Sequence, residues 1–281
     1  MSAIDQKAML DAGVHFGHLK KKWNPKMLPY IFAEKKGIHI IDLNKTAEKM
    51  QEAGAAMKHL AKSGKKILFV ATKKQGKDIV KEAAKSCGMP FITERWLGGM
   101  MTNFTTIRKS VKKMQSIDRM FKDGTVNSIN KKERLMLSRQ KEKLEKVLGG
   151  IEQLNRAPNA IFVIDISHEH IAIKESHKLH ITTFGICDTN SDPTKVDFPI
   201  PANDDASKSI ELIAKFMANA INEGLEERKN MKVEEETEES VDADLDGNDD
   251  ILEGEIEEGG TTEGGEKKPG GPTRKRIQRK K

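Results

Sequence analysis

Two short, uninterrupted apolar segments, residues 66–71 (KILFVA) and 160–166 (AIFVIDI), constrain the fold more than any other feature of this chain. Polar residues close each segment, which is typical of a strand buried on both faces of a parallel sheet. Shorter segments with strand character lie at residues 38–43, 91–93 and 182–187. Residues 198–201 (FPIP) are restricted to an extended edge segment, because proline cannot donate a hydrogen bond to the ladder.

Helical segments separate these strand candidates along the chain. They are predicted at residues 4–8, 44–62, 78–86, 170–178 and 207–223. Strands that alternate with helices form a parallel sheet that helices cover on both faces. The sequence therefore predicts an α/β fold with a doubly wound, mostly parallel sheet.

The segment between the two halves of this pattern, residues 104–157, has helical spacing of its own. Apolar side chains recur at steps of three, four and seven on either side of a polar break at residues 123–124. These positions are Ile107, Val111, Met114 and Phe121, followed by Leu137, Leu144, Val147, Ile151 and Leu154. We predict two helices with one apolar stripe each, joined as an antiparallel coiled-coil hairpin and inserted into the α/β domain.

Basic residues cover much of the remaining hairpin surface. They include Arg108, Lys109, Lys112, Lys113, Lys131, Lys132, Arg134 and Arg139. A narrow apolar stripe under so many cations indicates an arm that faces a polyanion, and we predict that these residues bind RNA. The alternative is a solvated two-helix insertion whose charges only maintain solubility.

These patterns divide the chain into three parts. Residues 1–103 and 158–232 form a discontinuous α/β domain, residues 104–157 the hairpin, and residues 233–281 a tail. The tail has sixteen acidic residues and no basic residue up to residue 266, then eight basic residues and no acidic one. We predict that it is disordered, because it cannot bury enough apolar surface to offset the entropy of ordering. The acidic part of the tail is predicted to screen the basic surfaces before assembly or to compete with RNA, and the terminal basic part to contact RNA.

The charge of the remaining chain indicates the class of partner. Residues 1–232 hold 41 Lys and Arg but only 27 Asp and Glu, which favours a phosphate-rich partner. The two cysteines, Cys87 and Cys187, are far apart and fit a reducing compartment. The sequence shows neither a signal peptide nor an apolar run of the roughly 20 residues that a membrane span needs. We therefore expect a cytoplasmic protein with no membrane partner.

A basic segment near the N-terminus is a second candidate for RNA contact. Its residues are His15, His18, Lys20, Lys21, Lys22, Trp23 and Lys26. We predict a structured, non-helical loop in which the cations contact phosphates and an aromatic ring stacks on a base. The alternative, compatible with the first, is that Trp23 and Phe16 anchor the loop to the core. Lys73 and Lys74, which follow a predicted strand, and Arg95 complete the predicted RNA contacts.

Carboxylates follow several predicted strands and raise the question of a metal site. Ligands of open α/β sheets bind outside the carboxyl ends of the strands, where Asp165, Asp188 and Asp205 are expected. These three side chains could hold a structural Mg²⁺, but Asp is also an ordinary turn and cap residue, and we predict no cofactor. The histidines at 168, 170, 177 and 180 lack the spacing of a zinc site.

No enzyme signature is recognisable in the sequence. It contains no GxGxxG after a strand, no GxxxxGK[ST] and no local Ser-His-Asp or Cys-His pattern. We predict that the chain is not an enzyme and has no catalytic residue. Two alternatives stay open: an α/β metal- or nucleotide-dependent enzyme with a carboxylate-lined pocket, and a scaffold whose hairpin binds another helix.

Several long motifs, in order along residues 3–228, resemble one known family. They are AGVHFGH (12–18), WNPKM (23–27), GIHIIDL (37–43), FVATKKQGKD (69–78), RWLGGMMTNF (95–104), KKERLMLSRQKEKLEKVLGGI (131–151), DTNSDP (188–193) and IPANDDA (200–206). Together they are similar to the ribosomal protein S-two family of the bacterial small subunit. The departures are mild: Ala202 replaces a common glycine, and Thr182 a common proline. The tail after residue 232 lies outside the resemblance.

The resemblance implies a flavodoxin-like domain with a projecting coiled-coil hairpin and no catalytic activity. It implies a structural, ribosome-associated role in translation, between the head and body of the small subunit. The partners would be small-subunit rRNA and neighbouring small-subunit ribosomal proteins. In bacterial relatives the protein helps to dock the large RNA-binding ribosomal protein S-one, and so supports mRNA capture.

Overall fold

The computed structural model describes residues 5–128 and 130–246 of the chain. Backbone contacts divide the chain into two units, Met1–Val233 and Glu234–Lys281. The first unit contains the described strands together with the helical hairpin, so the separation of the hairpin as a domain of its own stays a prediction. None of the described helices combines the length and the apolar character that a membrane span requires.

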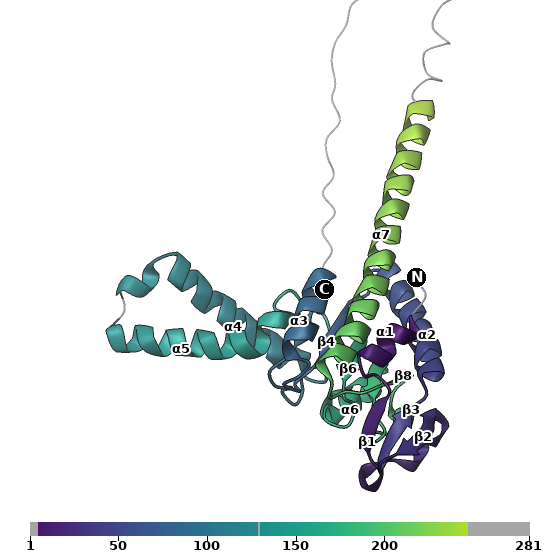
Figure 1. Cartoon of the computed structure of the whole chain (residues 1–281). Helices are drawn as coiled ribbons and strands as arrows, with labels where there is room; N and C mark the ends of the chain where they lie inside the picture. The colour runs from purple at the N-terminus through teal and green to yellow at the C-terminus, as the bar shows by residue number, and fades with distance from the viewer. Residues whose placement is uncertain (1–4, 129, 247–281) are drawn as a thin grey trace, which may run out of the picture. The chain divides into compact units, whose positions relative to one another are not determined.

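The main sheet of the described chain has five parallel strands. They are β4 (Ile67–Val70), β5 (Phe91–Ile92), β6 (Ala160–Ile164), β7 (Thr182–Cys187) and β8 (Phe198–Pro201). Their order is β5-β4-β6-β7-β8, which is the 2-1-3-4-5 order of flavodoxin-like folds (Figure 1). The predicted doubly wound parallel sheet is confirmed. At its edge, Pro199 and Pro201 of β8 lie opposite Gly185 and Cys187, so the extended edge segment is a true strand.

Helices cover both faces of this sheet because successive strand residues point to opposite faces. On one face, Ile67 and Phe69 belong to a core shared with α1 (Gln6–Asp11), α2 (Leu43–Lys62), α3 (Lys77–Ser86) and α7 (Ser207–Asp246). On the other face, Leu68 and Val70 pack with α6 (His170–Lys178) and with the root of the hairpin. The hairpin is therefore built into one layer of the domain.

The hairpin consists of α4 (Phe104–Lys122), the short turn η3 (Thr125–Ser128), α5 (Lys131–Leu148) and the turn η4 (Gly149–Ile151). Ile107 and Val111 are buried on the sheet face, whereas Met114 and Ile117 are buried but belong to none of the sheet cores. Beyond its root the hairpin therefore packs on itself and extends away from the sheet (Figure 1). The helical hairpin is confirmed; its packing as a coiled coil stays a prediction.

The N-terminal basic segment folds into more regular structure than the sequence indicated. It contributes β1 (Phe16–Leu19), η1 (Lys20–Lys22) and η2 (Pro25–Tyr30), and β1 joins β2 (Ile31–Lys35) and β3 (Ile38–Ile41) in an antiparallel sheet of order β1-β3-β2. Sequence reasoning identified only the third of these strands and excluded helix around the two prolines. A 3-10 turn tolerates them because Asn24 caps it, accepting from Lys26 N at 3.0 Å, and Pro25 occupies its first position.

The last described helix, α7, continues to Asp246, well past the predicted end at residue 223. Residues 234–246 are thus helical where we expected a disordered tail. Residues 247–281, including the switch from acidic to basic composition, lie outside the described residues. The turn η5 (Pro193–Lys195) completes the secondary structure of the described chain.

Candidate nucleic-acid interface

The outer faces of α4 and α5 carry most of the predicted RNA contacts. Exposed there are Lys109, Lys112, Lys113, Lys131, Lys132, Arg134 and Arg139. Within the described part of the chain, no ion pair joins the five lysines of this set to an acidic side chain. Their charges are available to an external anion.

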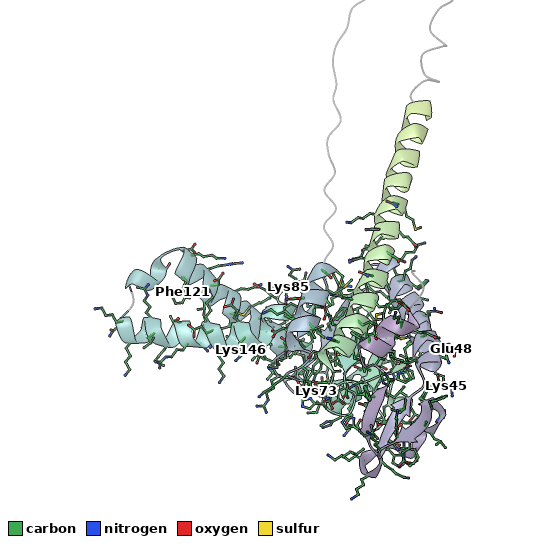
Figure 2. The ribbon with its side chains drawn as sticks, viewed as in Figure 1. Lys45, Glu48, Lys73, Lys85, Phe121 and Lys146 are labelled. Atoms are coloured by element: carbon green, nitrogen blue, oxygen red, sulfur yellow. The ribbon has the colours of Figure 1, made fainter. Side chains whose placement is uncertain are left out.

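Other cations of the hairpin have internal partners instead, among them Arg108 and Lys141. Arg108 donates to the carbonyl oxygen of Leu154 at 2.6 Å and also to the side chain of Asn155, which ties α4 to the segment after η4. Lys141 on α5 pairs with Asp118 on α4 at 2.5 Å and lies 5.9 Å from the ring centroid of Phe121, the aromatic residue labelled on the hairpin in Figure 2. These contacts fix the hairpin's shape.

The root of the hairpin is held by one carboxylate, Glu175 of α6. Its Oε1 accepts from Trp96 Nε1 at 3.1 Å and from the backbone N–H of Gly99 at 2.8 Å. Its Oε2 accepts from Met101 N at 3.0 Å and from both N–H and O–H of Thr102, at 3.1 and 3.2 Å. Burial alone would raise the pKa of Glu175, but these hydrogen bonds outweigh it and lower the pKa below its ordinary value.

A glycine completes the anchoring of the hairpin on the return side. A Cβ at Gly150 in η4 would lie 2.1 Å from the carbonyl oxygen of Phe91 in β5. The backbone leaving α5 therefore passes so close to the sheet that only glycine fits.

The aromatic residues of the N-terminal segment are engaged with the protein. Trp23 is half-buried, with its ring centroid 5.2 Å from that of His39. His15 lies 4.0 Å from Phe16, centroid to centroid, and burial lowers the pKa of His15. Trp23 therefore anchors the loop, as the alternative interpretation held, although Phe16 itself is exposed.

The lysines of the same segment differ in their surroundings. Lys20 pairs with Glu34 at 2.7 Å, and Lys26 pairs at 2.8 Å with an aspartate of the loop after β7. Lys21 and Lys22 are exposed, and no acidic partner for them lies within the described chain. Exposed pairs are worth little, so all four lysines remain accessible to phosphates.

Lys73, at the carboxyl end of β4, is in a different environment from the lysines on the outer faces of the hairpin. Its Nζ lies 2.8 Å from Asp204, 2.5 Å from Asp205 and 3.5 Å from Asp165. Burial would lower the pKa of Lys73, but its bonds to these carboxylates raise it overall. Lys73 (labelled in the body in Figure 2) neutralises the protein's own acids, whereas its neighbour Lys74 is exposed.

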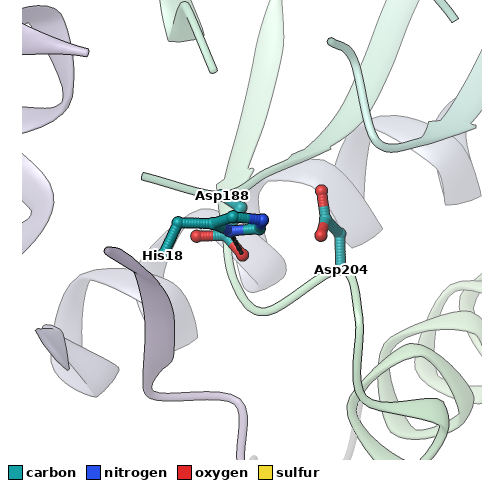
Figure 3. Close-up of side chains that lie close together, drawn as sticks. All are labelled: His18, Asp188 and Asp204. Carbon is teal, nitrogen blue, oxygen red and sulfur yellow. Dashed lines mark ion pairs between the residues drawn. The ribbon is translucent and has the colours of Figure 1, made fainter. Parts of the chain in front are cut away.

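The carboxylates around Lys73 also meet His18. His18 Nδ1 lies 2.8 Å from Asp188 Oδ2 (Figure 3). Its Nε2 lies 3.4 Å from Asp205 Oδ2. The hydrogen bond to Asp188 raises the pKa of His18 above its ordinary value, against the opposing effect of burial. Burial and the charges of Asp165 and Asp188 raise the pKa of Asp204. His18 is thus part of an ionic cluster at the carboxyl ends of the strands.

One set of atoms in this cluster has the spacing of a metal site. Ligand atoms of His18, Asp188 and Asp204 lie within 4.8 Å of one another, and Asp204 Oδ2 has no hydrogen-bond partner in the described chain. Of the three carboxylates expected from the sequence, Asp188 belongs to this set, whereas Asp165 and Asp205 do not. The histidine nitrogen suits a Zn²⁺-class ion better than Mg²⁺, which prefers oxygen ligands.

Arg95, the last predicted contact, is exposed beside a cavity of about 320 Å³. Thr72, His168 and Glu169 line the same cavity, and Thr72 N donates to Glu169 Oε1 at 2.9 Å. The cavity lies outside the carboxyl ends of β4 and β6, at the point where the strand order reverses.

Comparison with known proteins agrees with these features. The family described as ribosomal protein S2 matches residues 9–224. The chain belongs to the ribosomal protein S2 family. The small ribosomal subunit protein uS2 of Cytophaga hutchinsonii is 62% identical over 229 residues, which cover 82% of this chain and 90% of the relative. Those of Christiangramia forsetii (63% over 226 residues; 80% and 76%) and Parabacteroides distasonis (57% over 241 residues; 86% and 87%) are similar.

Membership in this structural family confirms the prediction that the chain is not an enzyme. The enzyme alternative finds no support in these relatives, and Asp165 and Asp205, which it placed in a pocket, pair with Lys73. Sequence reasoning missed the role of Glu175, although an acid on the inward face of the helix at 170–178, beside Ala172 and Ser176, was a usable signal.

Proposed function

We propose that this chain is a structural constituent of the small ribosomal subunit and binds its RNA mainly through the hairpin. The observation that carries the proposal is the set of exposed hairpin lysines that have no acidic partner among the described residues, in a chain of the ribosomal protein S2 family. Lysines so placed can each neutralise a phosphate and release its counterions, which gives affinity without sequence specificity. A cytoplasmic, ribosome-associated location follows from this role.

Charge reversal on the hairpin tests this role. Lys112, Lys113, Lys131 and Lys132 are replaced by Glu, and small subunits are separated on sucrose gradients. We expect the wild-type chain to co-migrate with small subunits and the variant to be largely lost from them. A matched control reverses four exposed lysines of the α/β body: Lys65, Lys81, Lys178 and Lys208. Equal incorporation of both variants would refute the role of the hairpin, and a wild-type chain found only at the top of the gradient would refute the ribosomal role.

For protein neighbours, the small antiparallel sheet provides a candidate surface. Phe16, Leu19, Leu28 and Phe32 on β1, η2 and β2 are exposed, Phe32 by 76%. Exposed apolar side chains grouped on one element are typical of protein interfaces. We assign this surface to a neighbouring ribosomal protein, with ribosomal protein S-one as the partner that would link the chain to mRNA capture. Phe32→Ala should weaken binding of purified S-one at least about tenfold, as expected for an aromatic hot spot; unchanged binding would exclude this surface.

We also propose that His18, Asp188 and Asp204, at the carboxyl ends of the strands, bind a divalent cation. The unpartnered Asp204 oxygen and the mixed nitrogen and oxygen donors support it. Calorimetric titration of the purified chain with Zn²⁺ and with Mg²⁺ should show tighter binding of Zn²⁺, abolished by Asp188→Asn. Heat of binding that survives this substitution would place the ion elsewhere.

A further inference from the structure

A cavity of the described chain lies at the opposite end of the sheet from the carboxylate cluster. It has a volume of about 610 Å³. Lys66 and Asn159, which line it, directly precede β4 and β6, so the cavity opens at the amino ends of the central strands. The turn before β5 and residues 149–157, at the root of the hairpin, form its other walls. Its size falls in the range of about 300–1,000 Å³ that is usual for ligand pockets.

The lining combines an apolar floor with a cationic rim. Met89, Phe91 and Leu154 supply apolar surface, and Met89 and Leu154 are buried. Exposed Lys85 and Arg156 stand at the rim with Lys66, whose Nζ donates to the carbonyl oxygen of Gly88 at 3.3 Å. That single bond leaves two ammonium donors of Lys66 available to a ligand.

The acidic side chain at this site does not cancel the cations. Glu152 is the one carboxylate among the described lining residues, and its Oε1 accepts from Gln115 of α4 at 3.1 Å. Three cations therefore face one acid that is already engaged with the hairpin. Such a site favours an anionic ligand with an apolar, flat portion.

We propose that this cavity binds one unpaired nucleotide of RNA, with the base against the apolar floor and the phosphate between Lys85 and Arg156. An aromatic base can stack on Phe91, and stacking tolerates any base. A duplex would reach only the rim, since its bases are enclosed in the helix. This inference rests on the proposed RNA-binding function and adds a contact for single-stranded RNA to it. A free nucleotide has the same chemistry, so the experiment must separate the two sources.

The first test measures affinity for a ten-nucleotide oligoadenylate at several salt concentrations. The full chain is compared with a Lys85→Gln, Arg156→Gln variant and with a control, Lys81→Gln, Lys178→Gln, that removes the same charge from exposed sites outside the cavity. Losing two charged contacts should weaken binding at least about tenfold. The slope of log affinity against log salt should fall by about 0.7, the value for one phosphate on a single strand. Equal effects of the two variants would overturn the proposal.

The second test locates the RNA and identifies its source. Ultraviolet cross-linking of the oligoadenylate to the full chain should label peptides that contain residues 85–91 or 152–159, and Ala157→Phe, which fills the cavity without a change of charge, should remove the label. Labelling only elsewhere overturns the inference. If adenosine monophosphate at equal nucleotide concentration cross-links to these peptides and the oligomer does not, the RNA assignment is wrong.

Failure here is distinguishable from failure of the proposed function. The Lys85→Gln, Arg156→Gln chain keeps its hairpin and should still co-migrate with small subunits on sucrose gradients. Normal co-migration together with unlabelled cavity peptides would reject the cavity and leave the ribosomal role intact. Absence of even the wild-type chain from small subunits would reject the ribosomal role itself.

Discussion

The hairpin and the carboxyl end of the sheet both carry lysines that the sequence alone marked as RNA contacts, yet their environments are opposite. On the outer faces of α4 and α5, Lys112 and Lys131 are exposed and have no acidic partner in the described chain. At the end of β4, Lys73 is bonded to Asp204 and Asp205. The difference shows that a basic residue can serve an external anion or the protein's own acids, and that only its three-dimensional neighbours decide which.

The strongest test of this contrast removes the internal cation. Lys73→Ala leaves Asp204, which is fully buried, without its counter-charge beside Asp165 and Asp188. Breaking a buried pair in this way costs about 3–5 kcal/mol, which should appear as a lower midpoint in urea unfolding. The control is Lys74→Ala, its exposed neighbour, for which a change within about 0.5 kcal/mol is expected. Similar midpoints for the two variants would mean that Lys73 is as dispensable as a surface lysine.

The next largest effect is expected at Glu175, the carboxylate that holds the root of the hairpin. Glu175→Gln keeps the side chain's size but turns an amide NH2 toward one set of donors, either Trp96 and Gly99 or Met101 and Thr102. We expect a loss of about 2–3 kcal/mol, since a buried donor left unsatisfied costs about 1–3 kcal/mol. The exposed Glu142→Gln on α5 is the control for the charge change. A variant as stable as the wild type would show that the root does not depend on this carboxylate.

The same carboxylate predicts a pH dependence. Hydrogen bonds lower the folded-state pKa of Glu175, so its contribution to stability is fully present above its unfolded pKa and is lost as the pH falls through its folded pKa. The stability gap between wild type and Glu175→Gln should therefore narrow as the pH is lowered from 6 toward 3. A constant gap across urea titrations in this range would contradict the assignment.

The smallest effect on stability is expected at the hairpin surface. Reversing Lys112, Lys113, Lys131 and Lys132 removes no described internal contact, so the unfolding free energy should change by no more than about 0.5 kcal/mol per site. RNA affinity should fall strongly in the same variant, and more at low salt than at high salt. A large loss of stability would mean that these lysines support the fold, and would erase the contrast with Lys73.

The sequence was sufficient for the parts of the fold that depend on local pattern. The apolar segments became β4 and β6 because hydrophobic runs of that length bury on both faces, and the helix at 170–178 has the predicted bounds. Contacts between residues that are far apart in the sequence could not be predicted from local pattern. Nothing local in the sequence indicates that Lys73 meets Asp204, 131 residues later, or that Arg108 turns inward to Leu154. Such pairs depend on how distant loops converge at the sheet, which spacing along the chain does not encode.

Gly150 and its contact with β5 have a mechanical consequence. Helix α4 has 19 residues, a length of about 28 Å at 1.5 Å per residue. The direction of the hairpin is therefore set at its root, where only glycine fits at position 150. A rotation of about 5° at this point would displace the tip of the hairpin by about 2 Å. A single methyl group added at residue 150 would change the orientation of the hairpin. Every basic side chain on the hairpin would then move, although none of them is substituted.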